Sequence, residues 1–473
     1  MTPRRRLFVL FLAVLGVTAI VIARRDGGGP EVTVPASGMA VAADARSGTW
    51  FCPGYPTEIP VADTRVTFAN PAPEPVEAIV TVAPDPGGAP GEPVRLTVAA
   101  RSVETRPRAE LGGPGALTVE AFGGGLVVEE GTAGAGGADS QACASRSAPN
   151  WYFAAGDTVK GVEQWLVVDN PYASDAKVDI TLRTSSGVRK ADALQGLDIG
   201  GRSRTVVPVH EYAVREERVA AEVAARLGRV VVSQVLRSGS DAGATGIMSA
   251  LGATAPSDDW WFAAGASGAT RAAVALVNVG TADLQVDVQA FVEDGPAQEP
   301  VTVEVARDDV VWVQLGDCST DTPACLAVAE GSRYGLRVRA DAGGAVVAEL
   351  RTASADGGAA GVALLGGVTV PAAEWRFARD RVADERLTTV SVLNGGAQPT
   401  RVDIVLVAQG REERPPALQG VELAPGRPVT LTVAEGARGD DAAIVVRAGA
   451  PVVVERSIAT TKDLGRSVGV PVR

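Results

Sequence analysis

Few residues of this chain have types that could support catalysis. The single histidine, His210, lies in Val209-His210-Glu211 at the end of a predicted strand. A general base needs a partner brought to it, and no G-x-S-x-G nucleophile motif is present. A catalytic triad needs more than one recognisable part. We therefore expect His210 to be an ordinary strand-end residue and the chain to be no enzyme, with no catalytic residues.

Carboxylates are the second candidates, because a pair of them can hydrolyse a glycosidic bond. They recur in two periodic sets, Asp179, Asp287 and Asp403, and Glu129, Glu349 and Glu455. Recurrence at equivalent places indicates scaffold positions, and we expect Glu349 and Glu455 to form surface or cross-strand ion pairs. Asp308-Asp309 and Asp440-Asp441 could bind calcium, but no D-x-[DN]-x-[DN]-G loop is present. We expect no metal and no cofactor.

The four cysteines, Cys52, Cys143, Cys318 and Cys325, include no C-x-x-C pair. With one histidine in the chain, a zinc site is hard to build. In an exported chain an even number of cysteines predicts disulfides. We expect Cys52–Cys143 to tie the opening strand of a first module to its exit segment, and Cys318–Cys325 to pin a short loop.

The aromatic side chains are the best candidates for contact with a ligand or partner: Trp151, Tyr152, Trp260, Trp261 and Trp375. Neighbours such as Trp260 and Trp261 point to opposite faces of a strand, so at most one of the two can lie in a core. An exposed ring could stack on a sugar or bind a partner. Packing in a core or in a seam between modules is the alternative, since most large aromatic residues are buried.

The elements that must position any site are four copies of one module. Each copy opens with a tryptophan-led strand, at Trp50, Trp151, Trp260 and Trp375. An asparagine closes an apolar run 18 to 20 residues later, at Asn70, Asn170, Asn278 and Asn394. The next strand alternates apolar residues in constant register to that asparagine, as in Val178, Ile180 and Leu182. We expect each asparagine to cap backbone groups of a turn.

About seven short strands in ~100 residues predict an all-β fold of tandem immunoglobulin-like β-sandwich modules. Propeller blades, the alternative, need only four strands and roughly 40–50 residues. One stretch, Val214 to Leu227, is predicted to be a short helix because Val219 and Val223 share a helical face with Leu227. The expected ranges are 1–25 for a cytoplasmic tip and anchor, 26–47 for a linker, and 48–147, 148–256, 257–371 and 372–473 for the four modules.

The N-terminal run from Leu7 to Ala23 is apolar and has arginines on both sides. A helix of this length is about 25 Å long, which is enough to span a membrane. The charge bias predicts a single-pass anchor in the cell membrane, with the N-terminus cytoplasmic and the body extracellular. The alternative is secretion after signal cleavage, with Ala40-Val41-Ala42 as one possible site. Arg24 and Arg25 disfavour cleavage directly after the run.

The net charge of −12 and the absence of a basic stripe beyond the N-terminus exclude nucleic acid as a partner. The motif set W-[YF]-F-A-A-G, an apolar run ending in Asn-Pro, V-D-[IV] and a final [AV]-E-[LR] strand resembles the actinobacterial DUF5719 proteins. The resemblance covers about Trp50 to Arg473, and it implies a membrane-anchored extracellular repeat protein without naming an activity. The first module departs from the pattern after Trp50 and at Ile79, and the fourth at Arg376 and Gly395.

These patterns favour a non-catalytic protein of the cell envelope. We expect its modules to form a rod or curved array that binds or positions a wall polysaccharide or another envelope protein. The alternatives are a structural spacer and an accessory subunit of an enzyme that processes envelope glycans.

Overall fold

Strands make up nearly all of the regular structure. The computed structural model describes residues 38–59, 63–134, 137–242, 244–266, 270–318, 324–354, 361–378, 385–433, 442–460 and 464–473. Within these ranges the one α-helix is α2 (Val209–Tyr212), beside the 3-10 helices η1 (Arg108–Leu111), η2 (Asp192–Leu194), η3 (Ser240–Ala242) and η4 (Pro416–Leu418). The predicted all-β fold is confirmed.

The predicted anchor, Leu7 to Ala23, lies outside the described residues. In the part of the chain that is described, no helix is long and apolar enough to cross a membrane. Pro35–Arg473 form one unit by their internal contacts, and the description below concerns that unit alone.

Module 1, defined by strands β1 to β8, consists of two antiparallel sheets. One sheet has the order β1-β6-β3-β4 and the other β5-β2-β7-β8. Its strands are β1 (Ser47–Cys52), β2 (Asp63–Asn70), β3 (Val76–Ala83), β4 (Val94–Val98), β5 (Ser102–Pro107), β6 (Ala116–Phe122), β7 (Val127–Gly134) and β8 (Gly137–Ala142).

Modules 2 and 3 repeat this arrangement, with sheets β12-β11-β15-β9 and β14-β10-β16-β17, then β18-β24-β20-β21 and β23-β22-β19-β25-β26. The strands of module 2 are β9 (Asn150–Gly156), β10 (Val162–Asn170), β11 (Ala176–Thr184), β12 (Gly187–Arg189), β13 (Leu197–Ile199), β14 (Ser203–Pro208), β15 (Val219–Leu227), β16 (Val231–Ser238) and β17 (Gly246–Leu251). Those of module 3 are β18 (Asp259–Ala266), β19 (Thr270–Asn278), β20 (Leu284–Val292), β21 (Val301–Val305), β22 (Val310–Gly316), β23 (Cys325–Ala327), β24 (Arg333–Ala340), β25 (Val346–Ser354) and β26 (Gly361–Gly366).

Module 4 differs in one respect, since a single long strand, β33, serves both of its sheets. The first part of β33 pairs with β27 and β29, and the second part pairs with β28 and β34. Its strands are β27 (Ala372–Phe377), β28 (Glu385–Asn394), β29 (Thr400–Ala408), β30 (Arg411–Glu413), β31 (Val421–Leu423), β32 (Arg427–Val433), β33 (Ala443–Thr460), β34 (Leu464–Val468) and β35 (Val470–Val472).

The strand order departs from that of an immunoglobulin domain, whose sheets have the orders ABED and CFG. When the strands of module 1 are lettered A to H, the sheets read A-F-C-D and E-B-G-H. The B–E and C–F pairs are shared with immunoglobulin domains. Strand A pairs with F instead of B, however, and G pairs with B instead of F.

The predicted register of the third strand is confirmed in every module. The apolar positions at eight, ten and twelve residues after the asparagine are all buried, from Ala78, Val80 and Val82 in module 1 to Val402, Ile404 and Leu406 in module 4. The residues between them are partly or fully exposed in β3, β11 and β20. Period-two burial therefore follows from the alternation of side chains along a strand that has one face on the core.

The helix predicted over Val214 to Leu227 is wrong, because Val219–Leu227 form strand β15. A spacing of four residues is a multiple of two as well as nearly one helical turn, so Val219 and Val223 also share one face of a strand. β15 pairs with β11 on one side and with β9 on the other. This pairing takes up backbone groups on both edges of the segment and overrides its alanine-rich helical propensity.

The asparagine that ends each second strand caps a turn, as predicted. Asn170 is 1% exposed. Its Nδ2 donates to the carbonyl of Ser174 at 2.9 Å and to the carbonyl of Ile199 at 3.1 Å. Its Oδ1 accepts from the N–H of Tyr172. The same bonds recur at the other three positions, Asn70, Asn278 and Asn394. A buried amide thus satisfies backbone groups at the same point of every module.

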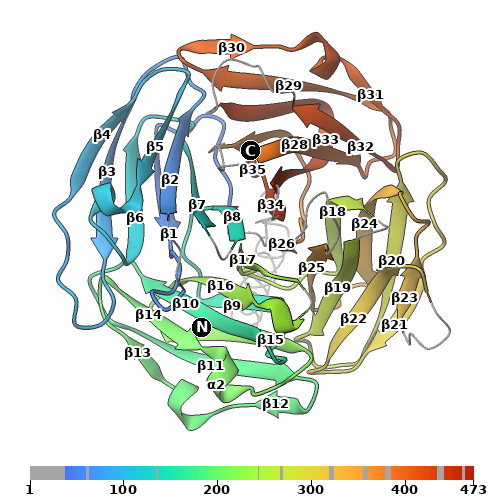
Figure 1. The fold of residues 1–473 in the computed structure, drawn as a ribbon, viewed down its shortest axis with the longest axis horizontal. Coiled ribbons are helices and arrows are strands. Elements are labelled where there is room, and N and C mark those ends of the chain that lie inside the picture. Colours follow the sequence, from blue (N-terminus) through green and yellow to red (C-terminus); the bar gives the residue numbers. More distant parts are fainter. Residues whose placement is uncertain are drawn as a thin grey trace, which may run out of the picture. The chain divides into compact units, whose positions relative to one another are not determined.

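The four modules follow one another in a closed cycle rather than in a rod. The last strand of the second sheet in each module lies innermost: β8 contacts β17, β17 contacts β26, β26 contacts β34, and β34 contacts β8. Figure 1 shows these four strands near the centre, with the other strands of each module outside them. Modules 1 and 4, the most distant in sequence, are therefore neighbours.

Candidate functional site

At three of the four interfaces between neighbouring modules, here called seams, a buried glutamate joins the two modules. Glu349 of module 3 is 2% exposed, and its Oε2 accepts the backbone N–H groups of Ala154 and Ala155 in module 2 at 2.8 and 2.7 Å. Glu455 of module 4 accepts from Ala263 and Ala264 of module 3 in the same way, at 2.7 and 2.8 Å. Neither carboxylate lies on the surface, and the arginines close to them in sequence pair elsewhere, Arg351 with Asp157 and Arg456 with Glu129, so the expected surface or cross-strand ion pairs with these arginines are not formed.

The third of these glutamates closes the cycle. Glu129 of module 1 accepts from the N–H of Ala378 in module 4 at 2.9 Å, across 249 residues of sequence. Arg456 of module 4 donates to the second oxygen of Glu129 at 2.8 Å, and both side chains are at most 2% exposed. A charged group in such surroundings needs a partner, so this pair ties the first and last modules together.

The seam between modules 1 and 2 is built differently, and two sequence departures explain why. The position equivalent to these glutamates holds Ser233, and the lead strand that would donate to it has Pro53, which has no N–H. Arg204 of module 2 replaces the missing bonds by donating to the carbonyls of Pro53 and Tyr55, each at 3.1 Å. It also forms an ion pair with Asp85 of module 1 at 2.7 Å.

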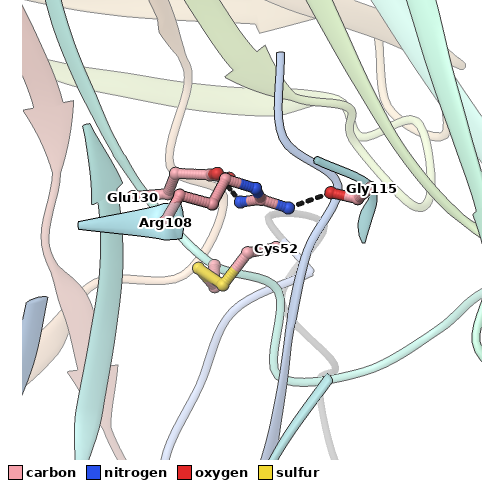
Figure 2. Close-up of a disulfide and its surroundings, with 5 residues drawn as sticks. Cys52, Arg108, Gly115 and Glu130 are labelled. Carbon is pink, nitrogen blue, oxygen red and sulfur yellow. Dashed lines mark hydrogen bonds and ion pairs between the residues drawn. A yellow bond between two sulfur atoms is a disulfide. The ribbon is translucent and has the colours of Figure 1, made fainter. Parts of the chain in front are cut away.

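A buried charged cluster lies beside this seam, next to the first disulfide (Figure 2). Arg108 donates to Glu130 and to the carbonyl of Gly115, and the predicted Cys52–Cys143 disulfide is formed. Cys318–Cys325 is formed as well. Asp169 is fully buried near the cluster, and burial raises its pKa to about 8, against the opposing effect of Arg204 and Arg108. Neither oxygen of Asp169 has a hydrogen-bond partner among the described residues.

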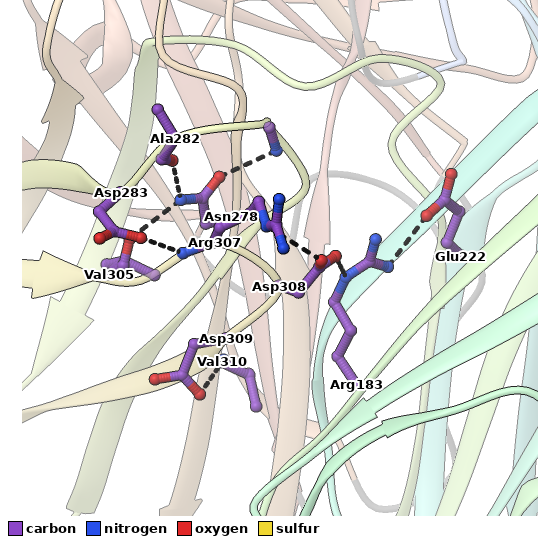
Figure 3. A network of polar contacts seen from close by, with 11 residues as sticks. Arg183, Glu222, Asn278, Ala282, Asp283, Val305, Arg307, Asp308, Asp309 and Val310 are labelled. Atoms are coloured by element: carbon purple, nitrogen blue, oxygen red, sulfur yellow. Dashed lines mark hydrogen bonds and ion pairs between the residues drawn. The ribbon is translucent and has the colours of Figure 1, made fainter.

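Asp308 and Asp309, the first of the two carboxylate pairs that could bind calcium, lie at the seam between modules 2 and 3, where Asp308 takes part in an ion pair (Figure 3). Arg183 of module 2 donates to Asp308 of module 3 at 3.0 Å and to Glu222 at 2.9 Å. Asp309 accepts from the N–H of Val310. Asp308 and Asp309 thus serve the seam and the turn, while Asp440-Asp441 lies outside the described residues. Among the described residues no group of three or more histidine, cysteine or acidic side chains could hold a metal ion.

A cavity of about 50 Å³ lies where the innermost strands meet, and all four modules contribute to its lining. The lining includes Gln141 of β8, Ser249 of β17, Glu349 and Leu365 of module 3, and Ser467 of β34. Four atoms of lining residues are buried without a hydrogen-bond partner among the described residues: Glu349 Oε1, Gln141 Oε1, Arg466 Nε and Ser467 Oγ. Such atoms usually have a partner, and the cavity has room for one.

The two chain ends of this unit meet beside the cavity. Val41 and Val472 form a parallel bridge, with the N–H of Val41 donating to Pro471 at 3.0 Å and the N–H of Arg473 donating to Val41 at 2.9 Å. Met39 lines the cavity and, like Val41, is 8% exposed. Cleavage after Ala42 would remove these contacts, so the alternative cleavage site at Ala40-Val41-Ala42 is part of the folded unit.

The aromatic candidates are placed mainly in cores and seams. Trp151, Trp260 and Trp375 are at most 1% exposed, and each indole N–H donates to a backbone carbonyl. Tyr152 is partly buried and bridges to Ala253. Trp261 is 5% exposed, stacks on Phe291 and lies under the Arg337 guanidinium. Both neighbours, Trp260 and Trp261, are thus buried. The alternation rule alone did not predict this, and the reason is that β18 also packs against β28 and β33 of module 4.

His210 lies in α2, directly after β14. Its Nδ1 is 3.0 Å from the carbonyl oxygen of Gln164, and its ring meets that of Trp165 edge-on, with centroids 5.0 Å apart. Two of the periodic aspartates brace turns, as expected of scaffold positions, since Asp179 accepts from the N–H of Gly196 and Asp403 accepts from the N–H of Gly420. Asp287 instead accepts from the hydroxyl of Thr302, its cross-strand partner in β21.

Gly395 provides a test of the seam between modules 3 and 4. A Cβ atom at this position would lie 2.8 Å from the ring of Trp261, which explains why module 4 has Asn-Gly where modules 1 and 2 have Asn-Pro. We expect Gly395→Ala to lower the free energy of unfolding by about 1–3 kcal/mol, the usual cost of overpacking. The measurement is equilibrium unfolding in urea.

Gly48→Ala is the matched control for this substitution, because its added Cβ would meet only the Trp50 Nε1 at 3.8 Å. If the two substitutions had equal effects, the close approach of Trp261 would not be what requires glycine at position 395.

The buried seam glutamates also predict a pH dependence of stability. Burial raises the pKa of Glu455 to about 7, against the opposing charge of Arg466. Between about pH 5 and 7 the folded state therefore holds a proton that the unfolded state has released. The free energy of unfolding should fall as the pH rises through this window, by about 1.4 kcal/mol per pH unit for one such group. Glu349 and Asp139, whose pKa values burial raises to about 7, act in the same direction.

Urea unfolding at pH 5, 6 and 7 measures this slope. Glu455→Gln should make the slope shallower by about 1.4 kcal/mol per pH unit, since glutamine does not titrate. Glu422→Gln, at an exposed position of β31, is the control and should leave the slope unchanged. A slope that is the same in all three proteins would contradict a buried, titrating Glu455.

Fold and site together define an all-β repeat protein with four two-sheet modules in a closed cycle. Residues 124–374, which are 251 of the 473 residues, match the family described as "Family of unknown function (DUF5719)". The chain belongs to this family, and the predicted resemblance is confirmed. A comparison with curated proteins gives no match.

Among solved structures, the alignment with the "Crystal Structure of Thermotoga maritima 1070" covers 24% of this chain and 93% of the chain in that structure. The identity is 14% and the TM-score 0.20, which is too low for any conclusion about fold or function.

Proposed function

We propose that this chain is a non-catalytic scaffold of the cell envelope whose closed cycle of modules binds or positions a wall polysaccharide or another envelope protein. The observation that carries the proposal is the closure of the cycle by Glu129, Arg456 and Ala378. A cycle closed by a buried ion pair holds all four modules in fixed relative positions, which is what a platform for a partner requires.

The placement of the polar groups supports a binding role over catalysis. The recurring carboxylates serve turns, seams and one cross-strand pair, and the buried ones accept backbone N–H groups. His210 contacts a carbonyl oxygen and an indole rather than an acid or a nucleophile. We further propose that the modules are distant relatives of immunoglobulin domains, on the strength of their shared B–E and C–F strand pairs.

The two disulfides indicate an oxidising environment. We propose, as part of the same function, that Leu7 to Ala23 anchor the chain in the cell membrane with the modules outside. The apolar length of this run and its flanking arginines support that topology.

Crosslinking of the full chain in its native envelope, followed by identification of what is captured, tests the proposal. We expect one wall polysaccharide or envelope protein to be captured repeatedly. Capture should be lost in Glu129→Ala, which opens the cycle, and kept in Glu120→Ala, which changes an exposed residue of β6. If only lipids and abundant proteins were captured, equally by all three chains, the binding role would fail and a structural spacer would be the better description.

A further inference from the structure

The three seam glutamates differ in how their charge is balanced. Arg456 donates directly to Glu129, and the charge of Arg466 acts on Glu455. Around Glu349 the stabilising groups are the N–H groups of Ala154 and Ala155 and the amide of Gln234, which are all neutral. The equivalent of Arg456 at this seam is Gln234, so the sequence has replaced the cation with an uncharged donor.

Glu349 is also the one of these three glutamates that lines the cavity where the innermost strands meet, here called the axial cavity. Its Oε2 takes all three of the neutral hydrogen bonds, and its Oε1 is buried with no partner among the described residues. Arg351 lies two residues further along the same strand, but it forms an ion pair with Asp157 of module 2. Arg466 lines the cavity too, and its charge acts on Glu455 and Tyr334.

Two further oxygen atoms of the lining residues are free to act as ligands. Gln141 Oε1 of module 1 and Ser467 Oγ of module 4 are buried without a partner among the described residues, and the two residues are 7% and 5% exposed. An acid, an amide and a hydroxyl from three different modules thus line one small cavity. Hard cations bind to carboxylate, carbonyl and hydroxyl oxygens of this kind.

We propose that the axial cavity is a binding site for one monovalent cation, held by Glu349 Oε1, Gln141 Oε1 and Ser467 Oγ. One uncompensated carboxylate matches one positive charge, whereas divalent ions in proteins usually take several carboxylates. A cavity of about 50 Å³ has room for an ion with a few waters. The ion supplies at this seam the charge that Arg456 and Arg466 supply at the other two.

The cation and a proton compete for the same oxygen of Glu349. Burial raises the pKa of Glu349 to about 7, because no cationic side chain offsets the loss of solvent. Cation binding should therefore strengthen from pH 5 to pH 8 as the carboxyl group loses its proton. Because the bound ion contacts three modules, it should stabilise the folded cycle.

The test compares unfolding of the full chain at pH 8 in rubidium chloride and in choline chloride at equal ionic strength. We expect rubidium to shift the folding equilibrium by about 11-fold at ten times its dissociation constant, and choline to have no such effect because it is too large for the cavity. Glu349→Gln should abolish the difference between the two salts. Glu129→Gln should keep it, since the charge at that seam is already balanced by Arg456.

Anomalous scattering from rubidium in crystals of the unmodified chain gives a second readout that does not depend on any variant. A peak among Glu349, Gln141 and Ser467 supports the site. A site occupied only by water, equal stability in both salts, or a rubidium effect that persists in Glu349→Gln would each overturn the proposal.

Discussion

Replacing Glu129 with alanine is expected to lower the free energy of unfolding by about 3–5 kcal/mol, the usual consequence of removing one member of a buried ion pair. The substitution leaves Arg456, which is 1% exposed, without its carboxylate, and it leaves the N–H of Ala378 without an acceptor. Equilibrium unfolding in urea measures the loss. Because this pair closes the cycle, the first and last modules should also become more accessible to hydrogen exchange at their seam.

Two comparisons separate this effect from a general one. Glu120→Ala, at an exposed position of the same module, should change stability by less than about 0.5 kcal/mol. The double variant Glu129→Leu with Arg456→Met should be more stable than Glu129→Ala, because it leaves no charge buried alone. A loss below about 1 kcal/mol in Glu129→Ala would mean that the seam between modules 1 and 4 is not a buried, closed interface.

The second large effect is expected from the disulfides, which close loops of very different length. Cys52 and Cys143 are 91 residues apart, and Cys318 and Cys325 are 7 residues apart. From loop-closure entropy, replacing the first pair with alanines should cost about 4–5 kcal/mol and replacing the second about 2 kcal/mol. The first pair joins β1 to the segment after β8, so its loss loosens both ends of module 1.

Urea unfolding of the two double variants, each beside the unmodified chain, measures this difference. The short-loop variant is the matched control, since it removes the same number of cysteines from module 3. Equal losses in the two variants would contradict the idea that the long-range disulfide restrains the unfolded module. A larger loss in the short-loop variant would contradict it as well.

Features that depend on neighbouring residues could be predicted from the sequence. The alternation of Val178, Ile180 and Leu182 specifies which face of β11 is buried, and a turn asparagine such as Asn170 is recognisable from its place after an apolar run. The helix predicted at β15 failed because a spacing of four residues fits both a helix face and a strand face. Only the pairing with β9 and β11, which is a tertiary property, decides between them.

The seams could not be predicted in the same way, because their partners are far apart in sequence. The bond from Glu349 to Ala154 spans 195 residues, and nothing local distinguishes a buried glutamate in Val-Val-Ala-Glu from one on a surface strand. One signal was available. Pro53 and Ser233 depart from the repeat together, and a missing donor paired with a missing acceptor indicates that the two positions meet.

The closed cycle itself is tested most directly by a crosslink between modules 1 and 4. Arg101 and Glu412 form a partly exposed ion pair with N and O atoms 3.8 Å apart, and all four native cysteines are in disulfides. With both residues changed to cysteine, a short bifunctional thiol reagent should join them within one monomeric chain. A pair at Arg101 and Glu330, the latter exposed in module 3, should not be joined. If the pair at Arg101 and Glu412 were joined no better than the pair at Arg101 and Glu330, this result would contradict the closed cycle and favour a linear array.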